Sequence, residues 1–224
     1  MTLSKLLGTA LFVGSLLVAS TARGQDKPAA KPPATEQPAQ PAPKAEATMV
    51  YVLMKTSKGD ITIELNQEKA PISVANFLSY VDKKHYDGLI FHRIMSNFMI
   101  QGGGHEPSMK ERETGKPIKN EWKNGLKNVK YSLAMARKGG PTGADSATSQ
   151  FYINVVDNPG LDRPDNYGAA YAVFGKVVAG FETVDKIKAV EVTGPERSTP
   201  VNPPKIESCR RMTAEEVSKL KVQR

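Results

Sequence analysis

Residues 91–103 read FHRIMSNFMIQGG, and this stretch places one arginine among large apolar side chains. Arg93 precedes Phe98 and Met99, and the neutral amide of Gln101 comes just before two glycines. Apolar surroundings rarely hold an arginine unless its five donors are satisfied. One guanidinium, one amide and an apolar floor suit a neutral, partly apolar ligand, and they do not suit a phosphate or a metal ion.

The positive charge of the chain lies mainly at its two ends. The 224 residues carry a formal net charge of +8, of which residues 1–24 contribute +2 and residues 210–224 contribute +3. The body between them carries only +3, whereas a nucleic-acid-binding protein concentrates basic residues on its folded domain. We therefore expect no nucleic-acid partner.

The first 24 residues are typical of an exported protein. Lys5 precedes an uncharged, Leu/Val/Ala-rich run from Leu6 to Ala22, which is the layout of a secretory signal peptide. An uncleaved anchor is the alternative, but the strongly apolar part is shorter than the roughly 20 residues of a spanning helix. We predict a cleaved signal peptide at 1–24, a periplasmic or otherwise exported protein, and no stable membrane insertion after processing.

Residues 25–48 form a separate segment by composition. They include six prolines and seven alanines, and no aromatic or aliphatic residue larger than alanine. Such a segment cannot bury enough apolar surface to offset its ordering entropy. We predict a disordered, extended linker.

The body, residues 49–210, alternates short strands with turns. A strand begins at Met49, a turn follows at 57–60, and a second strand covers 61–65. Pro71 opens a helix whose apolar positions recur every three or four residues, and a second amphipathic helix is predicted near 180–189. Further strands are predicted at about 90–94, 98–101, 131–136, 151–155, 171–178 and 203–209, with a long loop at 103–130. This order predicts an antiparallel barrel or sandwich, followed by a basic tail at 211–224 that forms a weak terminal helix.

Conventional catalytic groups are scarce. The three histidines lack metal-ligand spacing, and we predict that His92 packs on the face opposite Arg93. Ser146 and Ser149 have no identifiable base, and the lone Cys209 is predicted to be a small buried hydrophobe. The sequence therefore predicts neither a nucleophile nor a metal site.

Four blocks of sequence resemble the cyclophilins, in order, spacing and flanking residues. They are FHRIMSNFMIQGG at 91–103, SLAMARK at 132–138, ADSATSQFYINVVDN at 144–158 and YAVFGKVVAGFETVDKI at 171–187. The resemblance covers residues from about 49 to 209 and is most similar to the bacterial periplasmic branch of that family. It implies an all-β fold, a closed eight-stranded antiparallel β-barrel capped by two α-helices.

The resemblance also implies an activity, peptidyl-prolyl cis–trans isomerisation, that requires no cofactor. By similarity, Arg93 is the electrostatic catalyst, supported by Gln101, which orients Arg93 or holds a substrate carbonyl. The remaining positions carried over by similarity are the proline pocket of Phe98, Met99, Tyr152 and Leu161, with Tyr171 beside it, and the backbone of Ala136 and Arg137 with the side chain of Gln150, which hold the peptide. The expected partners are proline-containing peptides and unfolded exported proteins, and the expected state is a monomer.

Four positions depart from the best-known pattern of the family. Arg137 stands where an asparagine is usual, and Tyr152 replaces a phenylalanine and adds a hydroxyl that we expect at the pocket rim. Gly160 replaces a frequent tryptophan, and Tyr171 replaces a frequent histidine. A peptide-binding module or holdase chaperone that keeps the pocket without turnover remains the alternative. Arg93 discriminates between the two, because a pure binder gains little from a guanidinium aimed at an amide nitrogen.

Overall fold

The computed structural model describes residues 49–220. The predicted signal peptide and linker, residues 1–24 and 25–48, lie outside the described residues. The elements in chain order are β1 Val50–Thr56, β2 Gly59–Leu65, α1 Pro71–Asp82, β3 Ile90–Met95, β4 Met99–His105, β5 Ser132–Met135, β6 Phe151–Asn154, a 3-10 turn Pro159–Asp162, β7 Val173–Ala179, α2 Phe181–Lys188, β8 Val192–Thr193, β9 Thr199–Pro200, β10 Ile206–Arg211 and α3 Ala214–Ser218.

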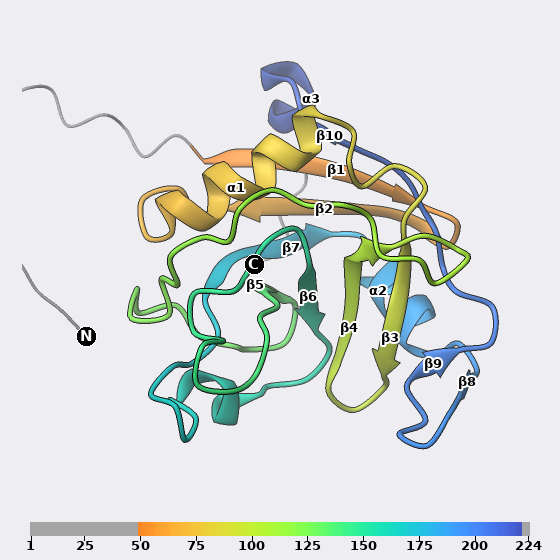
Figure 1. Ribbon diagram of the computed structural model, residues 1–224. Helices are drawn as coiled ribbons and strands as arrows, with labels where there is room; N and C mark the ends of the chain where they lie inside the picture. Colours follow the sequence, from red (N-terminus) through yellow and green to blue (C-terminus); the bar gives the residue numbers. More distant parts are fainter. Residues whose placement is uncertain (1–48, 221–224) are drawn as a thin grey trace, which may run out of the picture. The chain divides into compact units, whose positions relative to one another are not determined.

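Eight strands form one antiparallel sheet in the order β10-β1-β2-β7-β5-β6-β4-β3. The sheet curls around an apolar interior, with α1 packed against β10 and β7 and α2 against β2, β3 and β4 (Figure 1). The two end strands meet only where Ile90 bridges Lys205, together with backbone bonds such as Phe91 N–H to Pro204 C=O (2.9 Å). The eight antiparallel strands are confirmed, but the prediction of a closed barrel was overstated, because a proline-containing segment, 203–204, can supply few of the donors that a full ladder requires.

The first helix, α1, follows the predicted apolar pattern. Val74 and Phe77 are fully buried, and the Phe77 ring lies 5.6 Å from the Phe151 ring in an edge-to-face arrangement. The N-terminus of α1 has no local side-chain cap. Instead, the Glu121 carboxylate accepts hydrogen bonds from the backbone N–H groups of Ile72 (3.0 Å) and Ser73 (2.7 Å). A residue 48 positions along the chain thus satisfies donors that the start of a helix leaves open.

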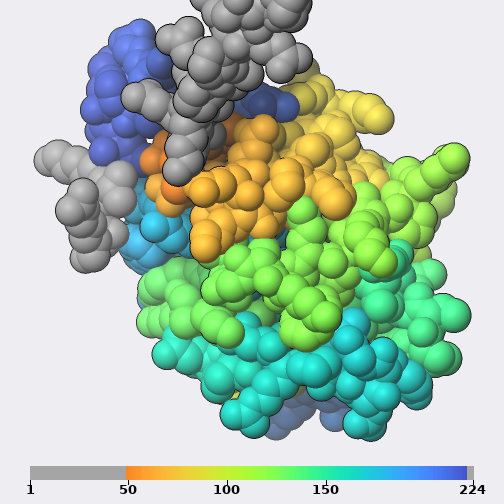
Figure 2. Space-filling model, turned by 90° about the vertical axis from the view of Figure 1, so that its left-hand side faces the viewer, coloured from red at the N-terminus to blue at the C-terminus, as the bar shows by residue number. Residues whose placement is uncertain are grey.

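The long connection between β4 and β5 is held against the rest of the domain. Figure 2 shows this green segment lying across one face, between the orange and yellow region of α1 and the cyan segment near residue 165. Glu121 joins it to α1, and the Asn120 side chain donates to the Ala170 carbonyl (3.0 Å). These two contacts tie the loop to α1 and to Ala170, the residue before Tyr171.

β4 is longer than the predicted strand, which ended at 101. It continues through three glycines to His105. Gly103 has φ +85°, and a Cβ there would lie 2.9 Å from the Phe151 ring. Glycine has no side chain, so these positions show no alternation of apolar and polar residues. The sequence pattern that identifies a strand is therefore missing where the β4 backbone passes close to β6.

The predicted second helix, the terminal helix and the burial of Cys209 are confirmed. α2 buries Val184 and Ile187, and the terminal helix α3 forms at 214–218 with a capping box between Thr213 and Glu216. Cys209 is buried, and burial raises the pKa of its thiol. Within residues 49–220, no helix is long and apolar enough to cross a membrane.

Candidate active site

The site is built on a single row of residues across five strands. In the sheet register Arg93 of β3 faces Gln101 of β4, Gln101 faces Tyr152 of β6, and Tyr152 faces Ala134 of β5, which in turn faces Val173 of β7. Alternation sends the neighbouring residues of these strands into the barrel interior. The pattern explains why apolar runs such as FYIN are buried on both faces.

The outward face of this row forms a second apolar cluster, distinct from the barrel core. Its buried members are Met99, Ala134, Tyr152 and Val173, and its partly buried members are Met95, Phe98, Leu126, Ala136, Leu161 and Tyr171. A pocket of about 130 Å³ opens on this cluster. Nine of the ten predicted site residues line it: Arg93, Phe98, Met99, Gln101, Ala136, Arg137, Tyr152, Leu161 and Tyr171.

The tenth residue, Gln150, lies in an adjoining hollow. This second pocket, of about 110 Å³, shares Gln101, Ala136 and Arg137 with the first. The Gln101 side-chain amide donates to the Gln150 side-chain oxygen (2.8 Å), and Gln150 donates in turn to Glu111 (3.3 Å). Gln101 therefore sits opposite Arg93 in register but is oriented by Gln150.

Arg93 lies at the rim of the pocket. Its side chain is 37% exposed, and Nη2 lies 3.6 Å from the Glu196 carboxylate, on the turn between β8 and β9. Ile94 N–H donates to the Ser198 carbonyl (2.7 Å), which holds that turn beside β3. Within residues 49–220, Glu196 is the only charged partner of Arg93, and sequence reasoning missed it because nothing in the motif points to a turn a hundred residues away.

His92, the residue before Arg93, faces away from the pocket as predicted. Its ring lies against the His105 ring at a tilt of 42°, with the two centroids 4.1 Å apart. Burial, followed by the nearby His105 and Arg93 charges, lowers the pKa of His92 from 6.5 to about 4. It is a packed, neutral histidine.

The Tyr152 hydroxyl is not at the pocket rim, and this prediction was wrong. The residue is 4% exposed, and its hydroxyl donates to the Asn128 side-chain oxygen (2.8 Å) in the interior. Burial raises the pKa of Tyr152 well above 10. The ring forms part of the pocket, while the hydroxyl points into a polar network behind it.

This network consists of asparagines that sequence reasoning missed. The Asn128 oxygen also accepts from the Asn154 amide (3.1 Å), and the Asn158 amide donates to the Phe98 carbonyl (2.8 Å). Asn128 and Asn154 are almost completely buried. Buried polar groups need such partners, so the asparagine inside the apolar strand FYIN, Asn154, was the available signal.

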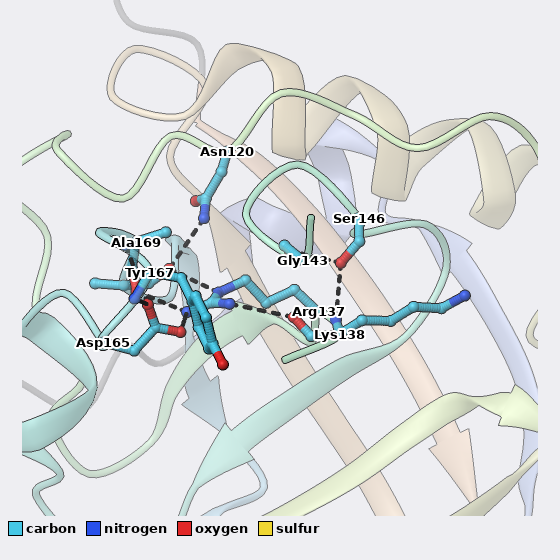
Figure 3. Close-up of polar contacts among 9 residues, drawn as sticks. Asn120, Arg137, Lys138, Gly143, Ser146, Asp165, Tyr167 and Ala169 are labelled. Atoms are coloured by element: carbon cyan, nitrogen blue, oxygen red, sulfur yellow. Dashed lines mark hydrogen bonds and ion pairs between the residues drawn. The ribbon is translucent and has the colours of Figure 1, made fainter. Parts of the chain in front are cut away.

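Arg137 lines the pocket, and its side chain is turned away from solvent. Nε donates to the Ala170 carbonyl (3.1 Å), and Nη2 donates to the Ala169 carbonyl (2.6 Å) and to Asp165 (2.9 Å), as Figure 3 shows. The side chain is 2% exposed. The hydrogen bond from Arg137 lowers the pKa of Asp165.

A larger hollow, of about 520 Å³, lies elsewhere, between the start of α1 and the loop 119–124. Its two carboxylates are already engaged, because Glu121 caps α1 and Asp145 pairs with Lys119 (2.7 Å). Among the described residues, no group of three or more His, Cys, Asp or Glu side chains could hold a metal ion.

Comparison with known proteins decides the family. The model for cyclophilin-type peptidyl-prolyl cis–trans isomerases matches residues 51–211. The chain belongs to the cyclophilin family. A peptidyl-prolyl cis–trans isomerase of Acinetobacter baylyi is 54% identical over 157 residues, which cover 69% of this chain and 81% of the relative. Isomerase B of Escherichia coli is 51% identical over 141 residues, which cover 62% of this chain and 84% of the relative.

Solved structures also match the fold of this chain. A crystal structure of a cyclophilin-type isomerase from Cryptosporidium parvum matches with a TM-score of 0.61 and 26% identity, over 74% of this chain and 98% of that one. A second structure of the parasite enzyme, determined in the presence of the dipeptide Ala-Pro, matches with a TM-score of 0.60 and 25% identity, over 73% and 99% of the two chains. The protein is a peptidyl-prolyl cis–trans isomerase with a cyclophilin fold.

Proposed function

We propose that Arg93 accelerates rotation about X–Pro bonds by donating a hydrogen bond to the prolyl nitrogen. Amide resonance holds this bond with a barrier of about 18–20 kcal/mol. As the bond twists, the nitrogen loses conjugation and becomes a better acceptor. A donor fixed near that nitrogen stabilises the twisted state more than either planar state, which is how binding energy lowers a barrier.

The observation that carries the proposal is the position of Arg93 at the rim of an apolar pocket. Phe98, Met99 and Leu161 line the pocket, and its 130 Å³ equals roughly four water volumes, enough for a small ring. A proline ring seated there would bring its nitrogen to the rim. The Arg93 guanidinium carries five donors, and its single charged partner in the described domain lies at 3.6 Å. Donors therefore remain for a substrate.

The adjoining hollow gives the rest of the peptide a place to lie. The Ala136 N–H already donates to the Gln150 carbonyl (3.0 Å), so Ala136 offers its carbonyl as an acceptor. The Gln101–Gln150 pair lies across this hollow and offers further polar atoms. In this proposal Gln101 and Gln150 hold the extended peptide while Phe98 and Tyr152 hold the ring.

The proposed clients are exported proteins, and the proposed location is the periplasm or another exported compartment. The apolar run at 6–22 and the Pro/Ala-rich segment at 25–48 support this assignment. Fractionation of cells that express the full chain provides the test. The processed protein should be found in the exported fraction with an N-terminus near residue 25, and an unprocessed protein in the cytosol would contradict the assignment.

Isomerase activity is tested with Ala-Pro peptides, in view of the parasite cyclophilin structure determined with that dipeptide. We expect the wild type to accelerate exchange over buffer and Arg93→Ala to lose about 10²–10³-fold in kcat/KM, the range seen for loss of one preorganised donor. Suppression of client aggregation, measured on the same two proteins, separates catalysis from the holdase alternative. If wild type and buffer give equal exchange rates while aggregation is suppressed, the holdase alternative is correct.

A further inference from the structure

We propose that Arg137 is a positioning residue whose guanidinium clamps the 165–171 segment onto the end of β5 and so fixes Tyr171 as a wall of the proline pocket. The proposal rests on the proposed function of that pocket. In this proposal the Arg137 guanidinium binds only groups of the protein itself and does not contact the substrate.

The hydrogen bonds of Arg137 account for most of its donors. Besides the bonds to Ala169, Ala170 and Asp165, Nη1 donates to the Lys138 carbonyl (3.2 Å). Four hydrogen bonds thus engage a group with five N–H donors. With its side chain 2% exposed, Arg137 cannot turn its fork toward a peptide without breaking these four hydrogen bonds.

The segment that Arg137 holds is itself a tight turn closed on Asp165. Oδ1 of Asp165 accepts from the N–H groups of Tyr167 (2.9 Å) and Ala169 (3.3 Å), while Oδ2 accepts from Arg137. The turn includes Gly168 with φ +81°. One carboxylate oxygen therefore builds the turn and the other attaches it to β5, and Figure 3 shows both contacts converging on Asp165.

A second contact holds the same segment from the opposite side. The Asn120 amide donates to the Ala170 carbonyl, which also accepts from Arg137 (Figure 3). Both Ala169 and Ala170 are buried. The segment is thus fixed between the β4–β5 connection and the end of β5.

Tyr171 follows this segment directly and receives its position from the clamp. The Arg137 guanidinium lies 4.5 Å from the centre of the Tyr171 ring, and that ring contacts Tyr152 edge-on at 5.9 Å. The Tyr171 N–H donates to the Leu161 carbonyl (3.1 Å). A shift of the clamped segment would therefore move two walls of the pocket, Tyr171 and Leu161, and leave Arg93 in place.

The test uses Asp165→Asn, which keeps Oδ1 for the turn but turns an amide toward the Arg137 fork. We expect a KM for an Ala-Pro peptide raised about threefold to tenfold, with kcat within about twofold, because pocket shape changes and the Arg93 donor does not. Arg137→Lys should raise KM by a similar factor, because an ammonium retains the charge and loses the planar fork. Asp82→Asn is the matched control, since Asp82 pairs with Arg211 at the surface (2.7 Å) and lines no pocket near Arg93.

The same variants distinguish a clamp from a direct contact. If Asp165→Asn leaves KM unchanged while Arg137→Lys raises it, the guanidinium acts on the peptide and the proposal is overturned. If Arg137→Lys does not fold, Asp165→Asn decides alone. NMR titration of peptide binding gives the same comparison without turnover, so a failure of the isomerase mechanism cannot be mistaken for a failure of the clamp.

An NMR signal supplies a further readout. The Nε–H of Arg137 in the wild type should exchange slowly with water, and its exchange should accelerate in Asp165→Asn. Fast exchange in the wild type would also overturn the proposal.

Discussion

Two arginines line the same pocket and differ in what their guanidinium groups contact. Arg93 on β3 is 37% exposed and meets one carboxylate at 3.6 Å. Arg137, just after β5, is 2% exposed and makes four hydrogen bonds to carbonyl groups and to Asp165. The two residues are of the same type and both line the pocket. They differ in how many of their N–H donors already make hydrogen bonds within the protein.

This difference between the two guanidinium groups indicates that the two sides of the pocket have different roles. The β3–β4 side presents an available donor, whereas the side formed by β5 and the 161–171 segment supplies shape. A buried guanidinium stabilises a structure only while its partners remain, and removal of one partner is costly. An exposed guanidinium contributes little to folding. Arg93 should therefore affect rate and Arg137 should affect stability and binding.

The largest effect on stability is expected for Arg137→Ala. The substitution leaves the Ala169 and Ala170 carbonyls without their charged donor, and we expect the free energy of unfolding to fall by about 3 kcal/mol. Arg93→Ala should change it by less than about 0.5 kcal/mol. Urea denaturation measures both. Equal losses for the two variants would remove the distinction between them.

His92, next to Arg93 on β3, extends the comparison to a partly buried side chain outside the pocket. Its pKa is about 4 in the folded protein, below the ordinary 6.5, because burial disfavours the charged form. The unfolded chain therefore binds a proton between pH 6.5 and about 4 that the native state does not, so stability falls as the pH falls through that window. The loss amounts to at most about 3 kcal/mol.

The control for this prediction is His92→Phe, which cannot titrate. Its free energy of unfolding should fall less than that of the wild type between pH 6.5 and 4. Parallel pH profiles for the two proteins would show that His92 is protonated in the fold.

Tyr152→Phe removes a hydroxyl from the network behind the pocket. Asn128 keeps its bond from Asn154 (3.1 Å), so we expect a loss of about 1 kcal/mol in stability and a KM within about twofold of wild type. Thermal unfolding and peptide kinetics measure the two quantities. A raised KM with unchanged stability would place the hydroxyl at the rim, where it meets the peptide.

Glu196→Gln should have the smallest effect. The Arg93–Glu196 pair is exposed, with the Glu196 side chain 71% accessible, and such pairs are worth less than about 1 kcal/mol. We expect KM to fall by no more than about threefold, because the carboxylate no longer competes for the guanidinium, and the difference should disappear at high salt. Glu191→Gln, on the same hairpin, is the control. A tenfold loss of kcat would instead show that Glu196 is needed to position Arg93 for catalysis.

The sequence predicted the parts of the site whose signal is local. Arg93, Phe98, Met99 and Gln101 lie within nine residues, and strand alternation places Met99 and Gln101 on one face. The roles given to these residues, like the inclusion of Tyr152 and Leu161, came from the resemblance to a family, and the sheet register places Tyr152 beside Gln101. The eight strands were predicted because short apolar segments alternate with turn-rich stretches along the body of the chain.

What escaped prediction depends on backbone atoms or on distant turns. The partners of Arg137 include the backbone carbonyls of two alanines. Because every residue has a backbone carbonyl, the residue type does not reveal which ones accept a hydrogen bond. The end of β4 was hidden by glycines, and Glu196 reaches Arg93 only because the β8–β9 turn packs on β3. The direction of the Tyr152 hydroxyl required the position of Asn128, which pattern analysis does not supply.

The most direct test of the account is the on-enzyme cis–trans exchange rate at saturating Ala-Pro peptide, measured by exchange NMR for wild type, Arg93→Ala and Arg137→Ala. We predict a loss of about 100-fold or more for Arg93→Ala, whose bound peptide lacks the donor to the prolyl nitrogen. For Arg137→Ala, we predict a rate within about threefold of wild type once the pocket is filled. An Arg93→Ala enzyme that exchanges its bound peptide as fast as wild type would contradict the account.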